Sequence, residues 1–166
     1  MPRTYEPIAS QTLGSDAATV TFSSIPSTFT DLILVCSVTA ENLRNALLRL
    51  NGDTATNYST TWLAGYGTSS VASSRASNDT LITGPSVYSG FSSTNPAVLS
   101  WQIMSYANTN VFKTALIAGG LGSTEVNRHV GLWRSTSAVT SVGLLLNGSG
   151  NFKTGSTFSL FGIKAA

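Results

Sequence analysis

Short apolar runs recur along this chain of 166 residues, separated by Gly, Ser, Asn and Asp. In residues 97–106, Leu99, Trp101 and Ile103 fall on one side of the alternation and the polar residues between them on the other. This period of two is typical of a half-buried antiparallel strand. The runs that predict strands are 18–22, 31–40, 45–53, 57–65, 97–106, 111–120, 126–134, 138–147 and 156–164. Their spacing after residue 97 is close to that of a sandwich or barrel.

Two runs are apolar on both faces. Residues 31–36 predict a central strand. The chain closes on GSTFSLFGIKAA, where Phe158 and Leu160 point one way and Phe161 and Ile163 the other. Because chain ends fray unless something ties them down, this run predicts a final strand inserted into a sheet. Either it is an ordinary buried strand, or another subunit covers its outer face.

Two stretches are harder to assign. Residues 41–50 place leucines at helical spacing, but Asn51-Gly52 follows at once and is a strong hairpin signal, so we expect a strand over 44–50. Residues 66–96 are rich in Ser and Gly and weakly patterned, which predicts a long loop. Tyr66, Tyr88 and Phe91 are its aromatic residues. They are expected to anchor the loop to its own domain or to a partner.

Composition supports an all-β domain. Only 10% of the residues are charged, against about 25% in an ordinary domain, and 25 Ser and 22 Thr supply most of the polar side chains. Ser and Thr suit strands and turns, whereas Glu and Lys suit helix surfaces. We therefore expect one antiparallel β-sandwich over residues 1–166. Residues 1–14 are expected to form an extended arm, because Pro2 and Pro7 favour extended backbone.

Charge and hydropathy limit the kinds of partner that the protein can be expected to bind. The net charge is +2, and the nine basic residues are scattered without a basic run, which argues against a nucleic-acid partner. No apolar stretch reaches the roughly 20 residues of a membrane span, and the first ten residues lack the apolar core of a signal peptide. The sequence predicts a soluble protein made in a cytoplasm.

The sequence offers little for catalysis or metal binding. His129 and Cys36 are the only residues of their types, so neither a histidine-rich metal site nor a disulfide framework is available. Cys36 lies in an apolar run and is expected to be a buried small hydrophobe. The seven acidic residues are spread singly, and no nucleophile elbow or phosphate loop is present. We expect no enzymatic activity and no cofactor.

Four phrases carry a resemblance to a known group: TYEPIASQTLGS at 4–15, LRLNGDTATNYS at 48–59, STEVNRHVGLWRSTSAVTSV at 123–142 and the closing GSTFSLFGIKAA. Together they resemble small virion structural proteins of tailed bacteriophages, many from cyanophages. The resemblance spans the chain and weakens over 66–96. It implies a jelly-roll-like sandwich, a homotrimer, and a place on the virion as a capsid decoration protein or a fibre module.

Two functions follow as hypotheses. The first is a capsid decoration or cement protein that binds the major capsid protein in the assembled shell, at the virion surface. Trp133 alternates with Val130 and Leu132, so it is expected to face outward or toward a partner. The residues expected at partner or subunit contacts are Pro2, Tyr5, Pro7, Ile8, Trp133, Phe161 and Ile163.

The alternative is a tail-fibre or head-fibre module that binds host-surface polysaccharide, because exposed aromatic rings stack on sugars. For each tryptophan the competing interpretation is packing in the core or between subunits. The aromatic candidates are Trp62, Tyr66, Tyr88, Phe91 and Trp133.

Overall fold

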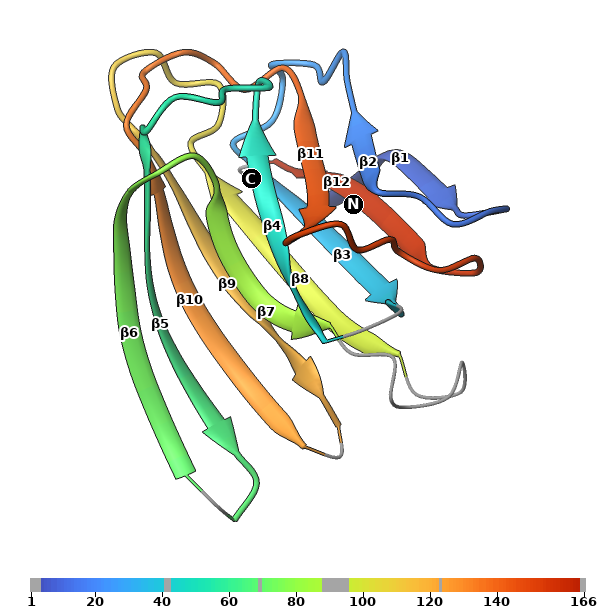
Figure 1. Ribbon diagram of the computed structural model, residues 1–166. Coiled ribbons are helices and arrows are strands. Elements are labelled where there is room, and N and C mark those ends of the chain that lie inside the picture. Colours follow the sequence, from blue (N-terminus) through green and yellow to red (C-terminus); the bar gives the residue numbers. More distant parts are fainter. Residues whose placement is uncertain (1–3, 41–42, 69, 88–95, 123, 165–166) are drawn as a thin grey trace.

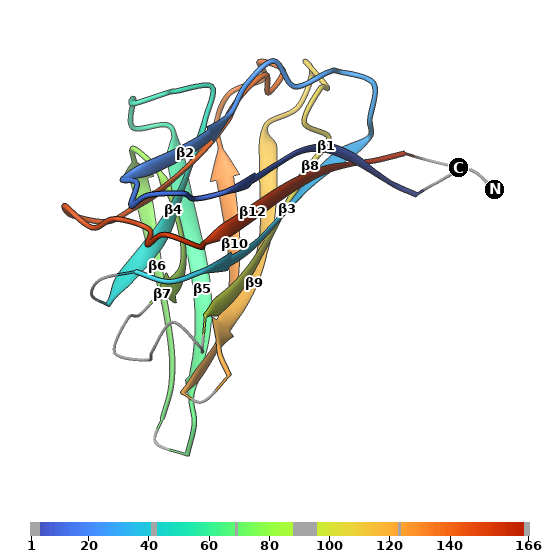
Figure 2. The same ribbon diagram turned by 90° about the vertical axis from the view of Figure 1, so that its right-hand side faces the viewer.

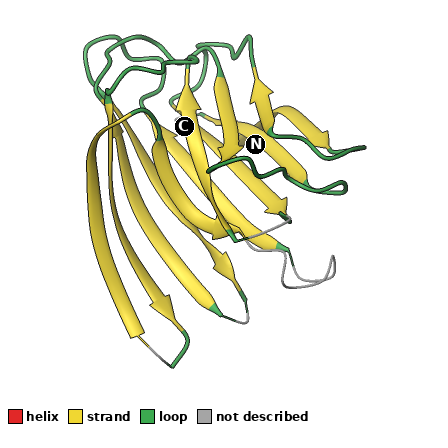
Figure 3. Ribbon diagram, viewed as in Figure 1, coloured by secondary structure: helices red, strands yellow, loops and turns green. Residues whose placement is uncertain are grey.

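In the computed structural model the regular structure is all β (Figure 3). The structure describes residues 4–40, 43–68, 70–87, 96–122 and 124–164. Within these ranges no helix is long and apolar enough to cross a membrane. The predicted all-β antiparallel sandwich is confirmed, and twelve strands form its two sheets.

Eight strands form the larger sheet, in the order β1-β12-β3-β8-β9-β10-β5-β6 (Figure 1). Its strands are β1 (Tyr5–Thr12), β12 (Thr157–Ile163), β3 (Asp31–Val38), β8 (Ala97–Met104), β9 (Lys113–Leu121), β10 (Glu125–Trp133), β5 (Tyr58–Tyr66) and β6 (Ser70–Asp79). The smaller sheet has the order β2-β11-β4-β7. It consists of β2 (Thr19–Phe22), β11 (Val142–Leu146), β4 (Arg44–Leu50) and β7 (Ile82–Val87).

The alternation seen in the sequence determines which side chains enter the core. In β8, Leu99, Trp101 and Ile103 are fully buried, whereas Val98 and Met104 are exposed. Each fully buried leucine or isoleucine contributes about 1.5–3 kcal/mol relative to its exposed state. The core residues of the facing sheet include Leu48, Leu50, Val142 and Leu144.

The two runs that are apolar on both faces lie inside the larger sheet. β3 pairs with β12 and β8, so the predicted central strand is confirmed. The closing strand β12 lies between β1 and β3, and Figure 2 shows β1 and β12 side by side. Phe158 and Leu160 face the core, and Phe161 and Ile163 lie half-buried on the opposite face, as predicted.

The predicted arm is extended, but the described part of it is not free. Residues 5–12 form β1, which pairs along β12 from Tyr5 opposite Ile163 to Thr12 opposite Thr157. The backbone of the final strand β12 therefore pairs with the backbone of the N-terminal segment. This segment is one of the two edge strands of the larger sheet.

The prediction of a long loop over 66–96 was wrong. Residues 70–79 form β6 and residues 82–87 form β7, which belong to different sheets. The sequence pattern is weak because β6 is an edge strand of small polar residues, with exposed side chains at most positions. Tyr88 and Phe91 lie outside the described residues.

The strand predicted over 44–50 is confirmed as β4, but the hairpin predicted after it was wrong. Asn51 and Gly52 form a tight turn with φ of +53° and +67°, and the Asp53 amide bonds the Leu50 carbonyl across 3.0 Å. The chain then crosses to the larger sheet instead of pairing with β4. The local turn signal is correct, but β4 pairs with β7 along one edge and with β11 along the other. No edge of β4 is therefore left for a hairpin partner.

Candidate functional site

The outer face of the larger sheet, which points away from the smaller sheet, is sparsely charged and carries exposed apolar side chains among Ser, Thr and Gln residues. It carries the residues that alternate with the core positions of β3, β5, β8, β9 and β10. Its exposed large apolar side chains are Val35, Leu63, Val98, Met104, Leu116, Val126 and Val130, with exposed fractions between 37% and 63%. Contiguous exposed apolar surface of this kind marks interaction sites in soluble proteins.

Strand register brings several of these residues into one row. Ile33 lies opposite Gln102, Gln102 opposite Leu116, and Leu116 opposite Val130. Directly opposite residues in neighbouring antiparallel strands place their side chains in contact on one face. A hollow of about 350 Å³ lies along this row, and Ser100, Ala118 and Arg128 line it as well.

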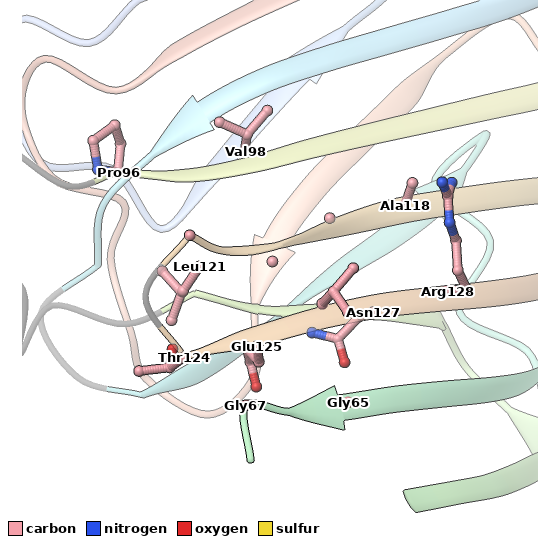
Figure 4. Close-up of a pocket in the computed structure, with 14 residues that line it drawn as sticks. Gly65, Gly67, Pro96, Val98, Ala118, Leu121, Thr124, Glu125, Asn127 and Arg128 are labelled. Atoms are coloured by element: carbon pink, nitrogen blue, oxygen red, sulfur yellow. The ribbon is translucent and has the colours of Figure 1, made fainter. Parts of the chain in front are cut away.

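A second, larger hollow of about 770 Å³ lies toward the β9–β10 turn (Figure 4). Gly120 lies opposite both Val98 and Val126, and Gly65 also lies opposite Val126. The two positions without side chains leave space between the valines. A Cβ atom at Gly120 would collide with the backbone carbonyl of Glu125, so glycine is required there.

The two hollows share Ala118 and Arg128 and form one trough across the outer face. In Figure 4 the Arg128 side chain extends to the same side of the sheet as Val98. The ion pairs among the described residues are Lys153–Asp16 and Lys164–Glu6, so Arg128 belongs to neither. The trough thus offers apolar surface, the Arg128 guanidinium group, which forms no ion pair among the described residues, and the Glu125 carboxylate at its β9–β10 end.

The inner face of β10 carries a second polar feature. Asn127 and His129 are only 4% and 6% exposed, and neither Asn127 Nδ2 nor His129 Nε2 has a hydrogen-bond partner among the described residues. His129 Nδ1 lies 3.0 Å from the Thr83 carbonyl, and its ring stacks with half-buried Trp62 at a centroid distance of 6.2 Å. Burial lowers the pKa of His129 to about 4, so the imidazole is neutral at neutral pH.

Trp133 does not face outward, so that prediction was wrong. It is 2% exposed, stacks with Tyr58 and donates from Nε1 to Asp53 Oδ2 across 2.7 Å. The sequence analysis identified the alternation in β10 correctly but assigned the core side and the exposed side of the strand the wrong way round. Val130 is the exposed residue, because a run of alternating apolar residues does not reveal which side the second sheet covers.

The other predicted contact residues are divided between two regions. Tyr5 and Pro7 are exposed on β1, whereas Ile8 is half-buried against the core. Phe161 and Ile163 are on the outer face of the larger sheet, at the β1 side of the trough. Tyr66 is half-buried at the end of β5, and Pro2 lies outside the described residues.

The sequence analysis missed the trough residues, although a signal was present. Val98, Leu116, Val126 and Val130 are apolar residues at the alternate, non-core positions of their strands. An apolar residue on the polar side of an alternating strand indicates that this side also meets an apolar surface.

The described ranges hold no candidate metal centre. They contain no group of three or more His, Cys, Asp or Glu side chains that could hold a metal ion. Cys36 is buried, as predicted, and burial raises the pKa of its thiol, which keeps it protonated.

Lys113 is fully buried, and burial lowers its pKa. Its Nζ donates to the carbonyls of Asn108, Val111 and Thr136 at 2.5, 2.8 and 3.2 Å. These three bonds use the donors of the ammonium group. Lys113 therefore fixes the adjoining loops.

The protein is thus an antiparallel β-sandwich with a trough on the outer face of its larger sheet. No protein-family model matches the chain, and no curated protein matches it. Among solved structures, Caenorhabditis elegans galectin LEC-6 is similar with a TM-score of 0.30 at 12% identity, over 96% of this chain and 91% of the galectin. That likeness is too distant to support an inference about function.

Proposed function

We propose that this protein is a non-enzymatic structural protein of a bacteriophage virion and binds the assembled capsid as a decoration or cement protein. The phage setting comes from the sequence resemblance. The observation that supports docking is the trough, which combines exposed valines and Leu116 with few charged residues, Arg128 and Glu125. Interface cores are depleted in most charged residues but enriched in arginine, so this composition suits a protein partner.

Docking would stabilise the shell by mass action. A protein that binds only assembled capsomers lowers the free energy of the assembled state relative to the dissociated subunits. A standard interface buries about 1,600 Å² in total. The trough crosses β3, β8, β9, β10 and β5, which places it in the middle of the outer face of the larger sheet.

The structure changes the expected role of the N-terminal segment. Residues 5–12 already pair with β12, so they are less suited to act as a free arm that reaches to the shell. Tyr5 and Pro7 remain candidates for contacts at the rim of the interface. The homotrimer implied by the resemblance stays a prediction.

The proposal is tested by adding purified protein to capsid shells that lack it and measuring the copies bound per copy of the major capsid protein. We expect the number of bound copies to be of the same order as the number of copies of the major capsid protein. Leu116→Asp, in the middle of the trough, should abolish binding without unfolding the domain. Val111→Asp, which changes an exposed valine outside the strands, is the matched control and should bind normally. Equal binding by both variants would exclude the trough as the docking surface.

A second candidate function is binding of host-surface polysaccharide, and the inner face of β10 favours it. Trp62 stacks with His129 and is half-buried, so part of its ring is open to solvent. Exposed aromatic rings stack on the apolar faces of sugars. A glycan array should then show hits that Trp62→Ala removes. An array without hits would reject this function.

A further inference from the structure

The larger sheet ends in an edge strand that is open to pairing. Among the described residues β6 is hydrogen-bonded only to β5, and Figure 1 shows it at the outer side of the sheet. It is ten residues long, SVASSRASND, and most of its side chains are exposed. Its free side presents a row of unpaired backbone N–H and C=O groups, which is a template for another strand.

The other three edges carry features that hinder strand addition. β1 contains Pro7, which lacks an N–H group, and its register is shifted between Pro7 and Ala9. β7 contains Pro85 and faces a register shift in β4 between Asn45 and Leu47. β2 is only four residues long. β6 has no proline, and its one register shift lies at its end, between Tyr58 and Ser59 of β5.

We propose that β6 pairs antiparallel with β6 of a second copy of this chain about a twofold axis at Ser74, which joins two larger sheets edge to edge. In this register Ser73 lies opposite Arg75 of the second copy, Ala72 opposite Ala76, and Val71 opposite Ser77. The proposal uses a different surface from the trough and does not depend on the proposed capsid role.

Side-chain chemistry supports a second copy as the occupant. Val71, Ser73, Arg75 and Ser77 lie opposite the outer-face residues Gly65, Leu63, Thr61 and Ser59 of β5, so alternate β6 residues belong to one face. Only a register that pairs residues of the same parity keeps the two outer faces on one side. Among these registers, an axis at Ser74 uses the full regular length of β6 and avoids placing Arg75 opposite Arg75. Like charges directly opposite each other would destabilise the pair.

The test is a register-specific cross-link. Opposite residues in antiparallel strands have Cα atoms about 4.5–5.5 Å apart, within the span of a disulfide. Ser74→Cys should therefore give a covalent dimer under mild oxidation. Ser77→Cys is the matched control, because its two copies would be six residues apart, or roughly 20 Å. The native Cys36 is buried and does not interfere.

Each outcome of the cross-link bears on the proposal. If the Ser74→Cys variant forms a covalent dimer and the Ser77→Cys variant does not, the result supports the pairing and its register. Equal cross-linking of both variants indicates random collision and overturns it. A monomer in both cases also overturns it, and β6 would then be free to accept a strand of another protein.

A mass measurement in solution provides an independent test. The wild-type chain should have the mass of a dimer, or of a hexamer if the homotrimer implied by the resemblance also forms. Ser73→Lys places a lysine opposite Arg75 of the second copy at two symmetric points and should give monomer. Adding Arg75→Asp to the same chain restores opposite charges and should restore the dimer. A trimer or monomer whose mass none of these changes affects would overturn the proposal.

Discussion

The indole N–H of Trp133 donates a hydrogen bond to Oδ2 of Asp53 across 2.7 Å. This contact joins β10 of the larger sheet to the segment through which the chain leaves β4. The Asn57 amide donates to the same carboxylate oxygen at 2.9 Å, and Tyr58 stacks on Trp133. The four residues fix the crossing between the two sheets at one end of the core.

Trp133→Phe should destabilise the fold by about 1–3 kcal/mol, because it leaves a partly buried carboxylate without one of its donors. Urea unfolding gives the free energy directly. Trp62→Phe is a suitable control, since Trp62 is half-buried in the same sheet and its ring contact with His129 survives as an aromatic pair. If Trp133→Phe lowers the free energy of unfolding no more than Trp62→Phe does, the hydrogen bond from Trp133 to Asp53 has no structural role.

Stability should fall between pH 6.5 and about 4 because of His129. Its pKa is about 4 in the fold, against about 6.5 in the unfolded chain, mainly because burial disfavours the charged ring. Between these values the unfolded state binds more protons, so acidification favours unfolding. The loss is about 3 kcal/mol, complete below pH 4.

Melting temperature against pH measures this effect, and His129→Gln should flatten the curve in that window. Asp53 acts in a different window. Hydrogen bonds from Asn57 and Trp133 lower its pKa, so its contribution is present above about pH 4 and is lost at lower pH. Asp53→Asn should therefore leave the slope above pH 4 unchanged. An unchanged slope in the His129→Gln variant would mean that His129 does not cause it.

Gly84→Ala should destabilise the fold by about 1–3 kcal/mol through overpacking. The added methyl group would overlap the Trp101 ring, which is fully buried and has no room to move. Gly143→Ala is the matched control, because there the nearest atom would be Thr21 Oγ1 at 3.5 Å, an ordinary contact. Thermal unfolding of the two variants should separate them clearly, and similar melting temperatures would contradict close packing of β7 on β8.

Asn51→Gly should cost about 1–3 kcal/mol in the free energy of unfolding, although glycine fits the positive φ of this turn. The side chain donates to the Ala138 carbonyl at 2.7 Å and accepts from the amides of Thr140 and Ser141 at 2.8 and 3.1 Å. It thereby holds the segment that enters β11. Gly52→Asn, at the other positive φ, removes no side-chain bond and should cost less. The opposite order, measured by urea unfolding, would show that backbone strain dominates this turn.

Some features followed from the sequence because they are local. The alternation of Leu99, Trp101 and Ile103 is a property of neighbouring residues in one strand, and it correctly predicted β8 and its core side chains. The turn at Asn51-Gly52 was also predictable, because these two residues tolerate positive φ at low cost. The small polar residues of β6 carry no such signal, so the strand was missed.

The sequence by itself determined that this chain forms an antiparallel all-β sandwich with a buried Cys36 and a tied-down closing strand. Alternation and low charge suffice for that, because a strand with one apolar face must bury it against another layer. Only the tertiary structure decided which face of β10 meets the smaller sheet, and so whether Trp133 or Val130 is exposed. The trough and the open edge at β6 depend on strand order and register, and residues far apart in the chain determine both.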